Sequence, residues 1–205
     1  ALADAGRLEE AQQSLDRLLT LPSTDPARTA GVAHRLGRAY AAAGRPHDAA
    51  ASYQAALDAA IAAHGPQAIQ LLLLLRPLAD ALLAAGRPGG AIAVLQRLAD
   101  LHDWSGGYHP GVADDLRTLA DLLLAQNRPT DALIHLNTAL DIDDQQDDVG
   151  HLIDDLTATI RALNLIGEHE EAERLRTEMA ALTATHSDAR DDPGERDCAT
   201  APGPT

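Results

Sequence analysis

The chain has 205 residues, a formal net charge of −15, and a hydrophobic fraction of 45% made almost entirely of Ala, Leu, Ile and Val. This length suits one sizeable domain or a short array of repeats, and an Ala- and Leu-rich core favours closely packed helices. The negative charge disfavours non-specific binding to nucleic acid or to an anionic membrane, because both need a basic surface.

One short sequence recurs along the chain at near-constant spacing. It reads AGRPHDA at 43–49, AGRPGGA at 85–91 and QNRPTDA at 126–132, with looser copies AGRLEEA at 5–11 and IGEHEEA at 166–172. The closing alanines are 38, 42, 41 and 40 residues apart. This spacing indicates one structural unit copied along the chain.

Each copy predicts the end of one helix and the start of the next. The hinge residues most able to adopt the left-handed conformation that ends a helix are Gly44, Gly86, Asn127 and Gly167. In three copies a proline follows two residues later, where a helix tolerates it because the first-turn N–H needs no partner. The predicted helices are 7–21, 27–43, 46–63, 67–85, 88–102, 111–126, 129–142, 149–166 and 168–184. Pro77 lies inside one of them and predicts a kink.

These helices form pairs, and the chain after them has a different composition. The predicted repeat domain covers residues 1–184, and its units are about 1–24, 25–65, 66–108, 109–147 and 148–184. Residues 185–205 are polar, contain Pro and Gly, and lack periodicity, which predicts a disordered tail.

The residues around the hinges carry a family signature. The pattern W-x₂-L-G-x₂-Y…A-x₃-F is matched, with Ala in place of Trp and Tyr in place of Phe, by Ala33, Leu36, Gly37, Tyr40, Ala49 and Tyr53. Later copies keep the small residues at 79 and 120, and again at 91 and 132. The chain therefore resembles the tetratricopeptide repeat family over about residues 2–182. Its longer period and the run YHPGVADDLRTLADLL resemble the kinesin-light-chain type, which occurs in bacterial multidomain regulators.

The resemblance implies an all-α fold, a right-handed α-solenoid of about five antiparallel helix pairs. The first repeat is truncated, which leaves the apolar face of helix 7–21 uncovered and indicates that the parent protein continues upstream. The last repeat is degenerate, with Thr159 and Ile160 in place of Leu–Gly and Arg176 at the aromatic position. An atypical terminal repeat suits a cap.

Sites for metals, cofactors or catalysis are not indicated. GEHEEAE at 167–173 has Glu173 where a zinc-binding H-E-x-x-H motif needs its second His. DIDDQQDDVGHLIDD at 141–155 lacks the Gly and Glu of a calcium loop, so we interpret it as a solvated acidic loop between repeats. No nucleophile, P-loop or dinucleotide motif is present, and the sequence contains no Lys. We therefore expect a non-enzyme without a cofactor.

The segment HDWSGGYHP at 102–110 is less clear. It brings two of the four aromatic residues, Trp104 and Tyr108, together with His102 and His109. This loop either contacts a ligand or folds back over the edge of a repeat, and the sequence leaves both interpretations open.

The resemblance implies that the first helix of each pair lines a concave binding groove. Counted from the matched positions 36, 78, 119 and 159, the candidate groove residues are His34, Arg38, Arg76, Asp80, Arg117, Asp121, Arg161 and Asn164. One hypothesis is that the four arginines form a ladder that binds a carboxylate-bearing peptide. The alternative is that Arg76 pairs with Asp80, and Arg117 with Asp121, four residues along the same helix.

The expected function is a non-catalytic scaffold whose groove binds a protein or peptide, as a module of a larger protein. The alternative is a ligand-sensing arm of a bacterial transcription regulator or signalling NTPase whose effector domain lies upstream. The lone Cys198 cannot form an internal disulfide, which is typical of the cytoplasm. Arg76, Pro77 and Asp80 interrupt the longest apolar run, 68–86, so we expect no membrane span.

Overall fold

The computed structural model describes residues 8–20, 25–105, 111–146 and 149–191, and the regular structure within these ranges is entirely helical. The α-helices are α1 (Leu8–Thr20), α2 (Pro26–Ala42), α3 (Pro46–His64), α4 (Leu72–Ala84), α5 (Pro88–Ser105), α6 (Val112–Ala125), α7 (Pro129–Gln145), α8 (Val149–Ile166) and α9 (His169–Asp191). A short 3₁₀ turn, η1 (Ile69–Leu71), precedes α4. The all-α prediction is confirmed for the described ranges.

The hinges have the predicted backbone geometry. Positive φ angles of 69°, 69°, 57° and 88° occur at Gly44, Gly86, Asn127 and Gly167. Three of the following helices begin at the hinge prolines Pro46, Pro88 and Pro129. The repeated sequence thus ends one helix in a left-handed residue and starts the next with a preset φ.

Two helices extend beyond their predicted ends. Helix α7 continues to Gln145, so the first part of the predicted acidic loop is helical. Helix α9 continues to Asp191, so residues 185–191 are helical and do not belong to the predicted tail. The remaining tail residues, 192–205, lie outside the described ranges.

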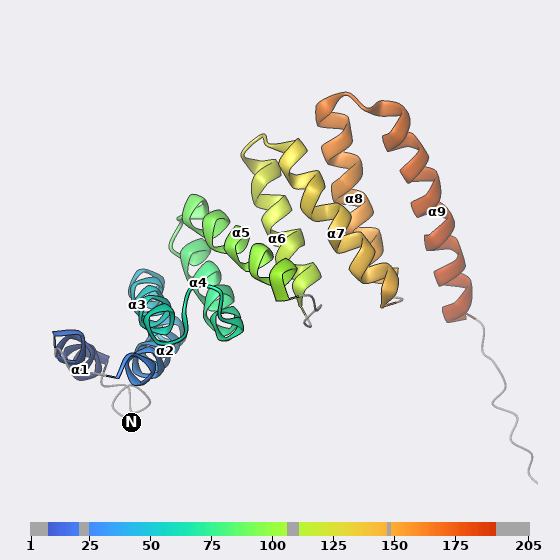
Figure 1. The fold of residues 1–205 in the computed structure, drawn as a ribbon. Coiled ribbons are helices and arrows are strands. Elements are labelled where there is room, and N and C mark those ends of the chain that lie inside the picture. The colour runs from blue at the N-terminus through green and yellow to red at the C-terminus, as the bar shows by residue number, and fades with distance from the viewer. Residues whose placement is uncertain (1–7, 21–24, 106–110, 147–148, 192–205) are drawn as a thin grey trace, which may run out of the picture.

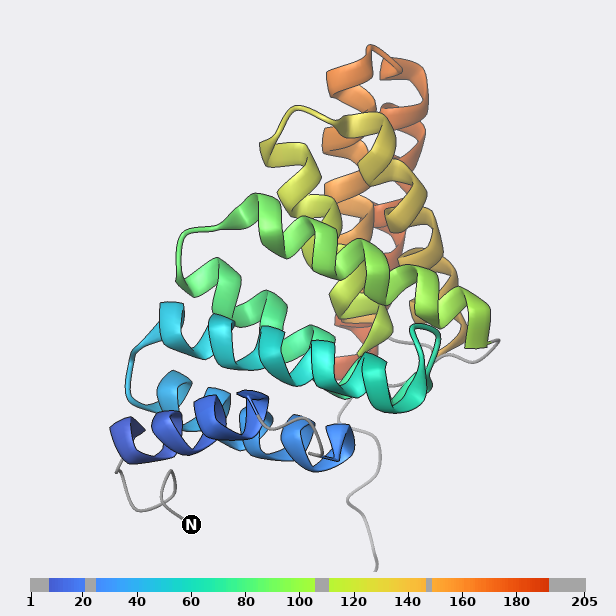
Figure 2. The same cartoon turned by 60° about the vertical axis from the view of Figure 1, so that its left-hand side comes forward.

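The helices stack in chain order. Every consecutive pair from α1 to α9 is in contact, and α1 and α9 lie at opposite ends of the stack (Figure 1). Figure 2 shows the same succession of two-helix hairpins from another side. Nearest-neighbour stacking of this kind defines a solenoid of helical repeats.

Small residues allow the two helices of each hairpin to cross closely. Gly37 on α2 is buried against the ring of Tyr53 on α3, and an added Cβ would lie 2.7 Å from Tyr53 Cδ1. The equivalent positions on α4 and α6 are Ala79 and Ala120, which are also buried. These contacts explain why the sequence keeps small residues there.

The two end helices of the stack bury few side chains. Ala11 and Leu15 of α1 are buried, so the expected uncovered face is covered at these residues, although Leu19 remains exposed. On the described part of α9 only Ala172 is fully buried. The mainly polar exposed surface of α9 is consistent with a cap.

The Gly37–Tyr53 contact yields a stability prediction. Gly37→Ala should lower the free energy of unfolding by about 1–3 kcal/mol, because the new methyl group overlaps the buried Tyr53 ring. Gly31→Ala on the same helix is the control. No atom lies within 4 Å of its added Cβ, so alanine there should be neutral or stabilise the helix by about 0.5–1 kcal/mol. Urea unfolding measures both, and equal effects would contradict the packing argument.

Candidate binding face

The first helices of the hairpins, α2, α4, α6 and α8, present a stripe of exposed and half-buried side chains. The stripe is made of three positions in each helix: five residues before, two residues before and two residues after the matched core residue. These three positions lie on the same side of an α-helix. We call this stripe the first-helix face; apart from Gly31, which has no side chain, it comprises His34, Arg38, Leu73, Arg76, Asp80, Asp114, Arg117, Asp121, Asp154, Thr157 and Arg161. It contains every predicted groove residue except Asn164.

Two of the four predicted arginines lie open on this face. Arg38 on α2 and Arg161 on α8 are exposed, and neither makes an ion pair with another described residue. Arg38 instead lies close enough to His34 to lower the pKa of its imidazole, although burial is the larger cause of that shift. The His34 ring also contacts Tyr53, with 5.8 Å between the ring centroids.

Arg76 on α4 links its own repeat to the next one. Its Nε donates to Asp80 Oδ1 at 3.2 Å, as the pairing hypothesis predicted, and its Nη1 donates to Asp115 on α6. Burial raises the pKa of the Asp115 carboxyl, and the nearby Arg76 charge lowers it only in part. Arg76 therefore compensates the charge of Asp115, which is not among the predicted groove residues.

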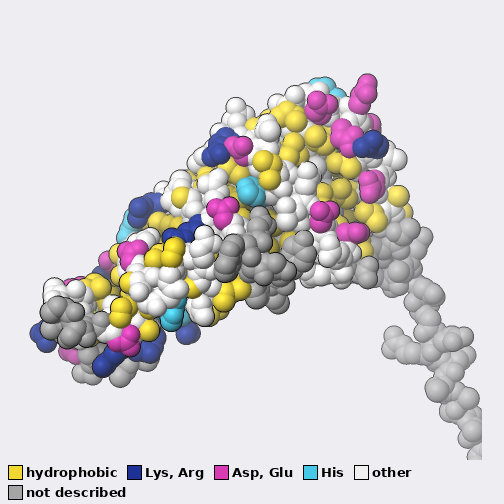
Figure 3. All heavy atoms as spheres, in the orientation of Figure 1, with side chains coloured by type: hydrophobic (Ala, Val, Ile, Leu, Met, Phe, Trp, Pro, Cys, Tyr) yellow, Lys and Arg dark blue, Asp and Glu magenta, His cyan; other side chains and the backbone are white. Residues whose placement is uncertain are grey.

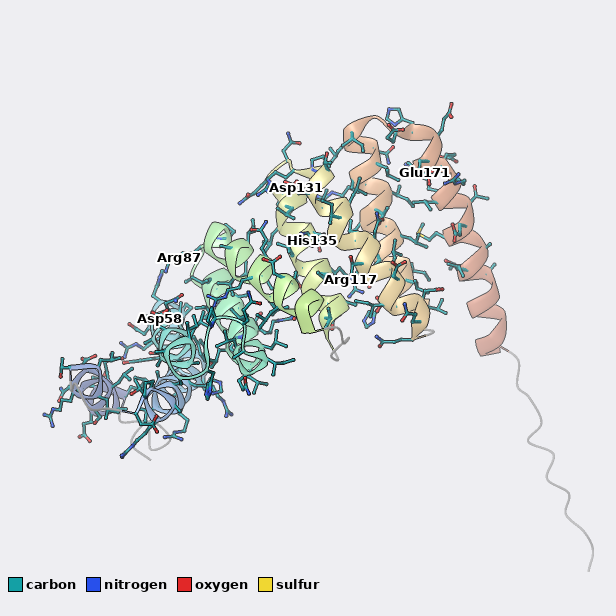
Figure 4. The ribbon with its side chains drawn as sticks, viewed as in Figure 1. Asp58, Arg87, Arg117, Asp131, His135 and Glu171 are labelled. Carbon is teal, nitrogen blue, oxygen red and sulfur yellow. The ribbon has the colours of Figure 1, made fainter. Side chains whose placement is uncertain are left out.

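Arg117 on α6 is surrounded by carboxylates from three helices. Its Nη1 donates to Asp114 at 2.7 Å, its Nη2 to Asp143 on α7 at 2.6 Å, and its Nε to Asp155 on α8 at 2.5 Å. Only 15% of its side chain is exposed. Figure 4 shows Arg117 where α6, α7 and α8 converge. The predicted partner Asp121 is not among its contacts, so that part of the pairing hypothesis is wrong.

The two arginine contacts repeat the same register. Arg76 and Arg117 lie two residues before their matched core positions, while Asp115 and Asp155 lie four residues before the core positions of the following repeats. Each arginine thus reaches the first helix of the next hairpin. At the preceding junction this pair of positions holds His34 and Leu74, and Leu74 is buried. The α4–α6 and α6–α8 junctions are therefore joined by charge.

The Asp155 carboxyl is the most deeply buried member of this network. Its side chain is 0% exposed, and burial raises its pKa to about 6 despite the opposing effect of Arg117. The nearby negative charge of Asp143, which is 4% exposed, raises this pKa further. Burial alone would lower the pKa of Arg117, but the surrounding carboxylates raise it overall.

The solvated acidic loop predicted for residues 141–155 is therefore wrong at its key positions. Asp143 lies in the last turns of α7 and Asp155 in the interior of α8, and both are buried around Arg117. For Asp155, as for Asp115, the sequence signal was a carboxylate at a core-facing helical position. The equivalent residue of α4 is Leu74, which is buried. A buried acid at such a position requires a cationic or hydrogen-bonding partner.

Asn164, the remaining predicted groove residue, lies near the C-terminal end of α8 and uses its side chain within the fold. Its Nδ2 donates to the backbone oxygen of Ile160 at 2.7 Å, and its Oδ1 lies 3.2 Å from Nδ1 of His169 at the start of α9. The amide is thus used at the α8–α9 turn.

A mainly apolar recess opens beside the first-helix face between α4, α5 and α6. Its volume is about 570 Å³, and the described residues lining it include Ile69, Leu72, Leu73, Leu98, Arg76 and Asp115. Leu73 is 74% exposed although it is a leucine. We call this the central recess. Recesses of this size and composition accept large side chains or small ligands.

A second recess lies on the other side of α4. It has a volume of about 510 Å³, and its lining includes Ala49, Tyr53, Pro77 and Asp80. The burial of Tyr53 and the negative charge of Asp80 both act to raise the pKa of the Tyr53 hydroxyl, while Arg38 opposes them. The carboxyl group of Asp80 and the hydroxyl-bearing ring of Tyr53 thus both line this second recess.

Most of the predicted aromatic segment lies outside the described residues. Within 102–110 this concerns residues 106–110 and the side chains of 103–105. Among described residues, no group of three or more His, Cys, Asp or Glu side chains is arranged to hold a metal ion. None of the described helices combines the length and hydropathy that crossing a membrane requires.

A stack of two-helix repeats that contact one another in chain order is the architecture of a helical-repeat protein. A sequence profile described as tetratricopeptide repeat matches residues 28–103 and 74–145. The chain belongs to the tetratricopeptide repeat family. Among curated protein sequences, none matches it.

Solved structures show the same fold at low identity. One is a Podosopora anserina protein described as a kinesin light chain with nearly identical TPR-like repeats, with 20% identity, a TM-score of 0.65 and coverage of 90% of this chain and 91% of that one. BtubC (BKLC) from P. vanneervenii has 19% identity and a TM-score of 0.66, over 100% of this chain and 85% of that one. MamA has 16% identity and a TM-score of 0.60, over 98% and 94%. The fold is thus that of kinesin-light-chain-like repeats.

The Arg117 cluster predicts an asymmetry between two arginines of the same face. Arg117→Met should lower the free energy of unfolding by about 3 kcal/mol, because it leaves the buried Asp143 and Asp155 without their cation. Arg161→Met, on the exposed part of α8, should change it by less than about 0.5 kcal/mol. Guanidinium unfolding compares them, and similar losses in both variants would argue against a structural role specific to Arg117.

The raised pKa of Asp155 predicts a pH-dependent difference. The folded state holds this proton more tightly than the unfolded chain, so the stability linked to it is complete below pH 3.8 and is lost as the pH rises to about 6. Asp155→Asn should therefore gain stability relative to the wild type between pH 4 and 7, by on the order of 2 kcal/mol. The matched control Asp121→Asn, at an exposed site, should show no such trend. Denaturant titrations at several pH values test this, and a flat difference for Asp155→Asn would refute it.

Proposed function

We propose that this chain is a non-catalytic scaffold that binds a protein or peptide on its first-helix face. The observation that carries the proposal is the central recess, which lies between α4, α5 and α6 beside the first-helix face and has the exposed Leu73 at its rim. Ile69, also exposed, lines the same recess. Exposed apolar side chains beside a recess are typical of an interaction site.

The opposite side of the solenoid supports this choice by contrast. In the view of Figure 3, charged side chains are distributed among hydrophobic ones over the second helices. The lining of the recess between α3 and α5 on this side includes the small residues Ala51, Ala55 and Gly90. Such residues provide little side-chain surface to anchor a ligand.

We further propose a cytoplasmic setting within a larger bacterial signalling protein. The lone Cys198 supports a reducing compartment. The long repeat period resembles the kinesin-light-chain type, which occurs in multidomain regulators.

Binding can be tested with a phage-displayed library of random twelve-residue peptides selected against the full chain. Fluorescein-labelled copies of the enriched peptides would then be titrated by fluorescence polarisation. Leu73→Asp should weaken binding at least about ten-fold, because it places a charge at the rim of the apolar recess.

Ile134→Asp is the matched control. Ile134 is 63% exposed and lies on the second helix α7, so the same apolar-to-acid change should leave affinity within about two-fold of the wild type. Enrichment of no peptide, or equal losses in the two variants, would exclude the first-helix face as the binding site.

A further inference from the structure

We infer that the partner is a basic peptide, which places one large apolar side chain in the central recess and Lys or Arg residues over α6 and α8. This inference rests on the proposed function and specifies the chemistry of its ligand. It opposes the sequence-based hypothesis of an arginine ladder for carboxylates.

The two central arginines are already neutralised. Nε and Nη1 of Arg76 donate to Asp80 and Asp115. All three nitrogens of Arg117 donate to carboxylates. A carboxylate from a ligand would have to displace one of these contacts and would meet the remaining acids at close range. Like charges placed together in this way oppose binding at an interface.

The carboxylates on the neighbouring surface are less compensated. Asp121 on α6 and Asp154 on α8 are exposed and make no ion pair with another described residue. The half-exposed Asp114 shares Arg117 with the buried Asp143 and Asp155. Among the described residues of the first-helix face on α8, Arg161 is the exposed cation. The α6–α8 part of the face is therefore negative and attracts cations.

Helix spacing limits the distance between the two features of the peptide. Arg76 bridges α4 to α6 directly, and α6 contacts α8. Packed helices lie about 8–10 Å apart and an extended chain advances about 3.3 Å per residue, so one helix corresponds to about three residues. The basic residues should lie about three to six positions from the apolar one.

The peptides selected from the library test the inference through their sequences and through two double variants. Enriched peptides should combine an apolar residue with Lys or Arg at that separation and should be depleted in Asp and Glu. Asp121→Asn/Asp154→Asn should weaken their binding about five-fold at low ionic strength, and the difference should shrink in high salt.

Asp100→Asn/Asp141→Asn is the control. These exposed carboxylates occupy equivalent positions on the second helices α5 and α7, nine residues after Ala91 and Ala132, so the same loss of charge should leave affinity within about two-fold.

The outcomes separate the inference from the proposed function. Acidic peptides that still depend on Leu73, or basic peptides whose affinity is unchanged in Asp121→Asn/Asp154→Asn, would overturn the basic-ligand inference and retain the binding face. Peptides that do not depend on Leu73 would overturn both.

Discussion

A two-helix hairpin has too little interior to bury the apolar side chains on both of its sides, so each hairpin of this chain depends on its neighbours. The buried clusters show this dependence directly. One extends from α1 to α5, and the next from α4 to α8, so that no hairpin in this region has a core of its own. Close crossing within a hairpin, as at Gly37 and Tyr53, sets the thickness of the unit that is stacked. The exposed stripe on the first helices is the consequence, because stacking covers their other sides.

Charge adds a second coupling between hairpins from α4 onward. Arg76 and Arg117 each reach an aspartate of the following first helix, while His34 and Leu74 occupy these positions at the α2–α4 junction. Buried ion pairs of this kind contribute little net stability relative to apolar packing, but they are costly to break. These ion pairs neutralise the two arginines within the fold. The charge of the adjacent surface is therefore determined by its exposed carboxylates.

The candidate binding face therefore has two parts with different chemistry. The central recess offers apolar surface around Leu73, and the α6–α8 part offers the exposed carboxylates Asp121 and Asp154. Apolar anchors supply most of the affinity at an interface, whereas surrounding charges select the partner and speed the encounter. A partner that uses both parts must cross from one repeat to the next, which couples recognition to the stacking of the solenoid.

The sequence by itself determined the repeat, the helices, the hinges and the family. The hinges depend on local backbone geometry, through residues in the left-handed conformation such as Gly44 and Asn127 and helix-starting prolines such as Pro46. Because these residues lie only a few positions apart, the sequence alone shows where a helix ends and the next begins. Only the tertiary structure decided which arginines are available. Arg76 and Arg161 look alike in a helical pattern, but whether a guanidinium is paired depends on carboxylates that lie 38 or 39 residues away in the chain, as at Arg117–Asp155 and Arg76–Asp115. The buried acids were misread for the same reason, since burial arises from neighbouring hairpins and not from the local sequence.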